Sequence, residues 1–185
     1  MRIILSCTTT HQREDIFYYC AQSLLNQNLQ PDIFLINISK EPYLKDNGFS
    51  KEPDWMKNNK ITINWVENIG SYRKLIPAIE YASDDDLVIT SDDDVIYGKE
   101  WLKDIVDAAL ADPDAIICAM ARYMKKNFIG NWQNYARWSL VEKPFRGLFI
   151  VPIGCAGIAY RKKNLDLEFL QNRKYLDIAP TILDY

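Results

Sequence analysis

One stretch of the sequence, residues 87–97, limits most strongly what this chain can fold into. It opens with four apolar or β-branched residues, and Asp92, Asp93 and Asp94 follow where a strand of that length should end. A short apolar run between turn signals predicts a strand buried on both faces, as in a parallel sheet covered by helices. Three adjacent carboxylates repel one another and are costly to desolvate, so they indicate a place that meets water or a cation. Ligands of open α/β sheets bind outside the carboxyl ends of the strands, so these oxygens are predicted to line a site.

The rest of the chain alternates between strand and helix patterns. Strands are predicted at residues 3–7, 32–38, 61–66 and 115–120, and helices at residues 14–26, 75–82, 98–111 and 165–176. Residues 148–160 are predicted to form one further strand, which Pro152, Gly154 and Gly157 interrupt, and glycines in such a pattern indicate a bulge or a ligand close to the backbone. Strand, helix and strand in this order build parallel sheets, so we expect an α/β fold.

Three polar or mixed segments lie between these elements. Residues 39–60 form a long polar excursion, whose length is typical of a functional loop. Residues 84–86 form an earlier acidic triplet, which we expect in a solvated turn because it precedes its strand. Residues 121–147 interleave aromatic and cationic side chains, a combination that suits sugar rings, phosphates or a membrane interface. We expect most of these aromatics to be core residues, and assign ligand contact to the segment rather than to any one tryptophan.

Length, charge and cysteine usage narrow the class of protein. The 185 residues are enough for one sizeable core and few for two domains. A net charge of −3 gives no electrostatic footprint for nucleic acid. The four widely spaced cysteines show neither CxxC spacing nor the density of a disulfide scaffold, which indicates reduced thiols in a cytoplasmic protein. No apolar run is long enough for a secretion signal or a transmembrane span, so only a location at the membrane surface stays open beside the cytoplasm.

Residues 67–74 contain cations that could bind an anionic substrate, although the net charge of the chain is negative. Gly70 and Ser71 predict a turn with backbone N–H groups that can meet an anion, and Arg73 and Lys74 follow. Two surface cations on a capped helix are an equally good interpretation of this segment alone. Hard oxygen ligands at residues 92–94 suit Mg²⁺ or Mn²⁺, and such ions usually accompany phosphate groups. The sequence therefore predicts a metal-dependent enzyme with a phosphorylated or nucleotide substrate.

Three stretches taken together resemble a GT-A-fold glycosyltransferase of family 2. They are residues 68–78, residues 88–97 with Trp101 and Leu102, and residues 152–160. The resemblance covers nearly the whole chain. It implies a single GT-A (nucleotide-diphospho-sugar transferase) domain over residues 1–185, with a Rossmann-like, mostly parallel sheet flanked by helices. It also implies a nucleotide-sugar-binding half at residues 1–97 and an acceptor-side half at residues 98–185.

The resemblance assigns roles on the donor side residue by residue. Asp92 and Asp94 match the outer acids of the DxD motif, which contact the ribose and a divalent metal, Mn²⁺ or Mg²⁺, on the diphosphate. Asp93 lies between them and is expected to assist in nucleotide binding. Thr8, Thr10 and Arg13 fall in the loop that holds the base and ribose. Gly70 and Lys74 match the segment that lines the nucleotide pocket.

On the acceptor side the resemblance places Gly154 and Gly157 at the floor of the site and Asp184 as the catalytic base. Such enzymes transfer a sugar from a nucleoside-diphosphate donor, a UDP-sugar being favoured here, to a hydroxyl of a glycan or another acceptor, usually with inversion. Two departures from the family pattern bear on this end: Leu183 stands where an acidic neighbour is common, and Ala156 where a glycine is frequent.

Two other interpretations stay open. One is a catalytically weak or non-catalytic protein of the same fold that binds a nucleotide or glycan. The other is a nucleotidyltransferase, although no glycine-rich loop with Arg or Lys follows the first predicted strand. If Asp184 is not the base, inversion and retention are both open.

Overall fold

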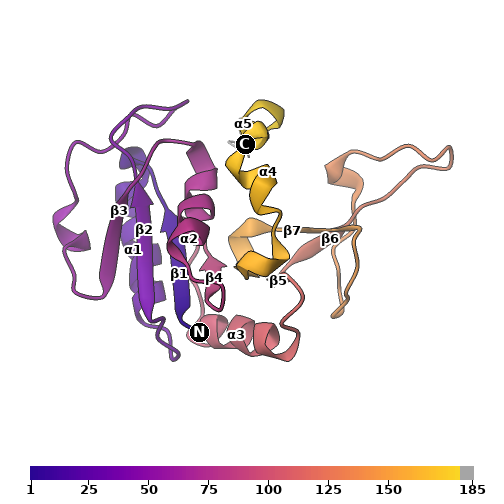
Figure 1. Ribbon diagram of the computed structural model, residues 1–185, viewed down its shortest axis with the longest axis horizontal. Coiled ribbons are helices and arrows are strands. Elements are labelled where there is room, and N and C mark those ends of the chain that lie inside the picture. The colour runs from indigo at the N-terminus through magenta and orange to yellow at the C-terminus, as the bar shows by residue number, and fades with distance from the viewer. Residues whose placement is uncertain (180–185) are drawn as a thin grey trace.

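Four parallel strands form the centre of the structure, a computed structural model that describes residues 1–179 (Figure 1). They are β3 (Ile61–Trp65), β2 (Ile33–Ile38), β1 (Ile3–Thr8) and β4 (Leu87–Thr90), in this spatial order. Two short strands, β8 (Ile158–Tyr160) and then β5 (Ile117–Cys118), extend the sheet beyond β4. β8 runs antiparallel to both of its neighbours, while the pairs β1–β2, β2–β3 and β1–β4 are parallel. The mostly parallel α/β sheet predicted from the sequence is thereby confirmed.

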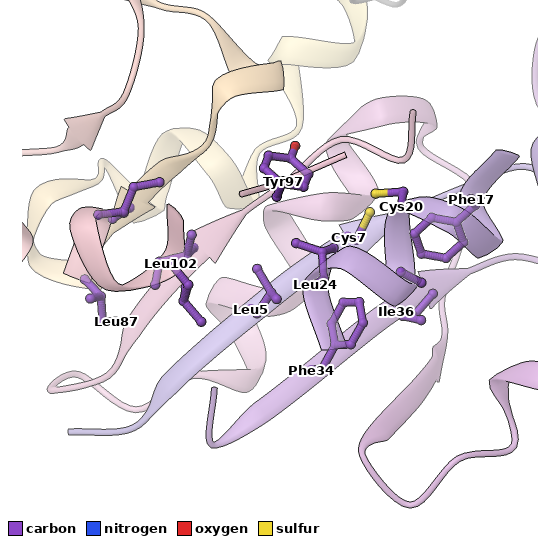
Figure 2. Packing of buried hydrophobic residues seen from close by; sticks show 14 of the residues in the cluster. Leu5, Cys7, Phe17, Cys20, Leu24, Phe34, Ile36, Leu87, Tyr97 and Leu102 are labelled. Atoms are coloured by element: carbon purple, nitrogen blue, oxygen red, sulfur yellow. The ribbon is translucent and has the colours of Figure 1, made fainter. Parts of the chain in front are cut away.

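Helices cover both faces of this sheet. α1 (Glu14–Leu25) and α3 (Trp101–Ala111) cover one face, and α2 (Ile76–Tyr81) covers the other. α4 (Leu167–Gln171) and α5 (Lys174–Ile178) follow β8, and Tyr175 of α5 packs against Ile76 of α2. The larger core cluster joins α1 and α3 to one face, with Phe17, Leu24 and Leu102 against Leu5 and Leu87 (Figure 2). On the other face Ala78 and Ile79 of α2 pack against Ile4, Leu35 and Val88. Successive strand residues thus point to opposite helix layers, which explains why β4 is apolar throughout.

The start of α2 follows the constraint that Pro77 imposes. A 3₁₀ helix over Gly70–Lys74 precedes α2, which begins at Ile76 and carries the proline in its first turn. Pro lacks an N–H and is tolerated there because that N–H would have no partner inside the helix. The helix predicted at residues 75–82 is therefore present, and it begins one residue later.

Several sequence predictions need correction. The excursion at residues 39–60 is packed rather than only polar, because Phe49 and Met56 are buried in the larger core cluster. The strand predicted at residues 148–160 is two strands in different sheets, because β7 (Ile150–Pro152) pairs with β6 (Ala121–Tyr123) in a separate ribbon and β8 joins the main sheet. Of the strand predicted at residues 115–120, only β5 (Ile117–Cys118) is formed.

The first acidic triplet is also not uniform. Asp84 and Asp85 are exposed, as expected, but Asp86 is buried. Its carboxylate accepts hydrogen bonds from the backbone N–H of Arg2 at 2.8 Å and from the Arg2 guanidinium, which ties the start of β4 to the start of β1. The prediction of a solvated turn was therefore wrong for this one residue.

All four cysteines are unpaired thiols; Cys7 and Cys20 are buried, and Cys118 and Cys155 are partly buried. Within residues 1–179 no helix has both the length and the apolar character needed to cross a membrane.

Candidate functional site

The carboxyl ends of β1 and β4 meet at the point where the order of strands reverses. From β1 the chain continues to β2 and β3 on one side, and then crosses to β4 on the other side. The pair Ser6 and Thr90 is in register, so Thr9 and residues 91–94 leave the sheet at the same edge. Such a switch point is where open α/β sheets bind ligands. Because β8 is antiparallel, its amino-terminal end and the turn at Gly154–Ala156 lie at this edge too.

Asp93 is the buried member of the second acidic triplet. Its carboxylate accepts a hydrogen bond of 2.7 Å from the Thr9 hydroxyl and forms an ion pair of 3.0 Å with Arg13. Burial raises the pKa of Asp93, and the Thr9 hydrogen bond and the Arg13 charge oppose that rise. Asp93 thus joins the loop after β4 to the loop after β1, which is a positioning role.

The outer two acids of the triplet reach solvent. Asp94 is exposed and its carboxylate lies 2.7 Å from the Arg13 guanidinium. Asp92 is partly exposed and forms an ion pair with the Lys74 ammonium. The side chains predicted as metal ligands are therefore the two that a ligand can reach, and each faces a cation.

The carboxylates of Asp92 and Asp94 suit a metal ion that takes only some of its ligands from the protein. Within residues 1–179, no three His, Cys, Asp or Glu side chains come together as a ready-made metal cluster. Mg²⁺ and similar ions in phosphate-binding sites commonly take one or two carboxylates, with substrate phosphates and waters completing the shell. Asp92 and Asp94, with their accessible oxygens, match this mode and not a closed cage.

Lys74 is held in place by the end of the sheet. The Ser6 hydroxyl donates a hydrogen bond of 2.7 Å to the Lys74 carbonyl, and the Asn37 amide of β2 donates to the same Ser6 oxygen at 3.0 Å. Gly70 at the start of this 3₁₀ turn has φ +63°, in the left-handed region that favours glycine. Its N–H donates to the Asn68 side chain, so this N–H already has a partner within the turn.

Arg73 differs from its neighbour Lys74, because it is 1% exposed and points into the protein. Its guanidinium forms an ion pair of 2.8 Å with Asp46 and donates to the Thr9 carbonyl at 3.3 Å. Asp46 also accepts a hydrogen bond of 3.0 Å from Asn68. The interpretation of Arg73 as a surface cation was therefore wrong; it supports the loop that carries Thr9. Asp46 and Asn68 were not predicted, since each is one of many polar residues in its segment.

The turn before β8 closes the site from the other side. A Cβ added to Gly154 would lie 3.3 Å from the Lys74 ammonium nitrogen, so this backbone lies close against the Lys74–Asp92 pair. The Tyr97 hydroxyl donates to the Cys155 carbonyl at 2.9 Å and accepts from the Asp92 N–H at 2.9 Å. Tyr97 therefore links the acidic loop to this turn, a role that the sequence analysis missed.

The remaining predicted site residues are placed as follows. The Thr8 hydroxyl donates to the Asn37 carbonyl at 2.7 Å, so this hydroxyl already has a partner at the edge of the sheet. The Thr10 carbonyl accepts from the Arg13 N–H at 3.0 Å and so shapes the loop after β1. Gly157 has φ +99°, and a Cβ there would lie 2.5 Å from the Trp101 ring, so the residue shapes the turn. Asp184 lies outside the described residues.

Comparison with known proteins decides the family. The family model for glycosyl transferase family 2 matches residues 7–169, which include Lys74, the acidic triplet and the turn at Gly154. The chain belongs to glycosyl transferase family 2. The family predicted from the sequence is thus confirmed, and Asp184 lies beyond the matched part of this family 2 chain. No curated protein matches it significantly.

A solved structure supports the fold of this family 2 chain. It is similar to 2-C-methyl-D-erythritol 4-phosphate cytidylyltransferase from Francisella tularensis, with a TM-score of 0.50 and 10% sequence identity. The similarity covers 97% of this chain and 82% of that chain. At this identity the likeness concerns the fold alone.

Proposed function

We propose that the protein transfers a sugar from a nucleoside-diphosphate donor, with a UDP-sugar as the first candidate, to a hydroxyl of a glycan or another acceptor. The observation that carries the proposal is a pair of accessible carboxylates at the switch point of a family 2 chain: Asp92, which faces Lys74, and Asp94, which faces Arg13. We assign the donor side to residues 1–97 and the acceptor side to residues 98–185.

Asp92 and Asp94 are the proposed ligands of Mn²⁺ or Mg²⁺. When bound, such an ion would supply positive charge to the diphosphate leaving group. The chain adds its own charge, because the Lys74 ammonium lies at the same edge and can exchange its Asp92 contact for a phosphate oxygen. Asp93 and Thr9 hold the two loops at a fixed separation, which keeps the outer carboxylates in place.

The acceptor's proton needs a base, and Asp184 is our proposed residue for it. The glycine backbone at Gly154 leaves room beside the Lys74–Asp92 pair, where a larger residue would project its side chain towards Lys74. We propose that this space admits the donor's sugar and the incoming hydroxyl.

The first test is a calorimetric titration with UDP, GDP, CDP and ADP, each with and without Mn²⁺. We expect UDP to bind only with Mn²⁺, and Asp94→Ala to abolish that binding. Asp84→Ala is the matched control, because Asp84 is an exposed acid of the other triplet, and it should bind as the wild type does. If none of the four nucleotides binds in either condition, the donor site is not functional and the proposal fails.

Two further measurements separate the alternatives. Mn²⁺-dependent release of UDP from a UDP-sugar in the absence of acceptor would distinguish a working transferase from a non-catalytic binding protein. A nucleotidyltransferase would instead bind CTP or another triphosphate more tightly than the diphosphate. The arginine of the loop after β1, Arg13, is paired with Asp93 and Asp94, so a triphosphate would have to replace these contacts in the way that we propose for Lys74.

A further inference from the structure

The segment at residues 122–149, called the flap below, projects from the body of the protein. Figure 1 shows the loops beside β6 and β7 extending away from the main sheet. Its aromatic residues were predicted to be mostly core, and this is wrong. Phe128 is 99% exposed and Leu148 is 94% exposed, and six others are also exposed: Ile129, Trp132, Tyr135, Leu140, Phe145 and Phe149.

The flap's first loop is ordered by its own hydrogen bonds. The Gln133 N–H donates to the Lys125 carbonyl at 2.8 Å, and the Asn127 N–H donates to the Asn131 carbonyl at 2.8 Å. The Asn127 side chain accepts from the N–H groups of Ile129 and Asn131 at 3.0 Å each. This closes a tight turn, so Phe128 and Ile129 are presented at the tip of a defined loop.

The flap's second loop, which leads into β7, contacts the first loop. The rings of Trp132 and Phe149 have centroids 5.6 Å apart, and the Met124 N–H donates to the Phe149 carbonyl at 2.9 Å. Leu148 therefore lies next in sequence to a residue that contacts the first loop. The exposed apolar side chains are thus concentrated in one projecting segment, with a ring contact between its two loops, and such a concentration marks an interaction site.

Charge identifies the kind of partner. The flap contains six Lys or Arg and one acid, which gives a net charge of +5, while the whole chain has −3 and the remainder therefore −8. Lys125, Lys126, Arg137, Lys143 and Arg146 are all exposed, and the Lys126 ammonium lies 4.5 Å from the centroid of the Trp132 ring. Aromatic and apolar tips flanked by Lys and Arg are the composition of segments that lie in the interface of an anionic bilayer.

We propose that the flap docks on the surface of a membrane rich in anionic phospholipid. Phe128, Ile129 and Leu148 enter the boundary between headgroups and acyl chains, and the flanking cations contact lipid phosphates. A second copy of the chain suits the flap less well. Two flaps packed face to face would each bring a net charge of +5 to the contact, and like charges repel.

This inference stands on exposure and charge and does not depend on the proposed function. The test is co-sedimentation of the full chain with vesicles of phosphatidylcholine alone, or of phosphatidylcholine and phosphatidylglycerol in equal parts. We expect the protein to pellet with the anionic vesicles only, and less so as ionic strength rises.

Two double variants examine the two halves of the surface. Phe128→Ser with Leu148→Ser removes apolar contact, and Lys125→Glu with Lys143→Glu reverses charge; each should weaken vesicle binding by about tenfold or more. The matched controls are Leu44→Ser with Leu110→Ser, and Lys51→Glu with Lys60→Glu, which change exposed residues elsewhere. The controls should bind as the wild type does.

Three results would overturn the proposal. The first is that wild-type protein stays in the supernatant with anionic vesicles, and the second is that the control variants lose binding as strongly as the flap variants. The third is that the wild type is a dimer in light scattering and that Phe128→Ser with Leu148→Ser converts it to a monomer. The last result would make the flap a self-association surface. Calorimetric titration of the same variants with UDP tests the donor site separately. The flap variants should bind UDP as the wild type does, so a failure of the membrane proposal and a failure of the proposed function give different results.

Discussion

The Lys74 ammonium forms an ion pair with the Asp92 carboxylate, which joins the turn before α2 to the end of β4. Lys74 is predicted to line the nucleotide pocket and Asp92 to bind a metal, and their contact places both at one point of the sheet edge. Under the proposed function the pair implies an exchange: a bound diphosphate would compete with Asp92 for Lys74, and a divalent cation would compete with Lys74 for Asp92.

Replacing Lys74 should therefore weaken diphosphate binding specifically. We expect Lys74→Met to raise the Kd for UDP in the presence of Mn²⁺ by about tenfold, the effect of losing one charge-assisted hydrogen bond. Uridine, which has no phosphate, should bind as before, and Lys74→Arg should retain part of the affinity. Lys99→Met serves as the control because Lys99 is exposed on the loop before α3. Unchanged affinity for UDP in Lys74→Met, measured by calorimetry, would reduce the ion pair to a structural contact.

Arg73 should matter for stability. Burial lowers the pKa of Arg73, and its pairing with Asp46 offsets that effect. Arg73→Met leaves the Asp46 carboxylate buried without its cation, so we expect a loss of about 3–5 kcal/mol in the free energy of unfolding. Arg73→Met with Asp46→Asn should recover part of this loss, since no buried charge is then left. Urea unfolding measures both, and Asp107→Asn in the exposed pair with Lys103 should change little. A double variant no more stable than Arg73→Met would contradict this account.

Asp86 should make the fold sensitive to acid. Hydrogen bonds from the Arg2 side chain hold the pKa of Asp86 well below its usual range, against the effect of burial. Because the folded-state pKa is depressed, the stabilisation is present above the unfolded value of about 4 and is lost as pH falls through the folded value. Asp86→Asn should therefore be less stable than wild type at neutral pH, and the difference should narrow below about pH 4.

Urea unfolding across that pH range checks this behaviour. Asp85→Asn, at the exposed neighbour, should follow the wild type throughout. A difference between Asp86→Asn and wild type that is the same at every pH would show that the carboxylate contributes through shape rather than charge.

Gly157 should not tolerate a side chain. Its φ of +99° is rarely adopted by other residues, and an added Cβ would lie 2.5 Å from the Trp101 ring and 2.8 Å from Ile105. We expect Gly157→Ala to cost at least about 1–3 kcal/mol, from backbone strain alone. Gly98→Ala is the matched control, because a Cβ at Gly98 meets no atom within 4 Å. Equal thermal unfolding temperatures for the two variants would show that the turn relaxes freely.

The central strands and the two long helices could be predicted because their apolar residues repeat with the period of the element. β1, β2, β3, β4, α1 and α3 fall where the pattern placed them, within a few residues. The short strands could not be resolved in the same way. β7 and β8 are separated by a single turn, and nothing in their composition tells that one belongs to the ribbon and the other to the main sheet.

For polar residues, the residue type was predictable and the orientation was not. Before β4, Asp84, Asp85 and Asp86 are identical in kind, but only Asp86 is buried, where Arg2, far away in sequence, and the Ser83 N–H donate to it. At the candidate site the same holds. Arg73 and Lys74 are adjacent cations, yet the 3₁₀ turn directs one to Asp46 and the other to Asp92. The exposure of the flap was missed for a related reason, because aromatic content indicates burial only where a second layer exists to cover it.

The pairing of β5 with β8 has a consequence for how this protein can change. Cys118 lies in register with Ile158, so the chain leaves the main sheet and returns to it at neighbouring positions. The flap lies within this interval, so it is an insertion between two strands that remain paired with each other. The flap can therefore be lengthened, shortened or exchanged while β1 and β4, which lead to Thr9 and Asp92, keep their register. Under the proposed function, recognition of a new acceptor or surface can thus evolve, or be engineered, in the flap without rebuilding the donor side.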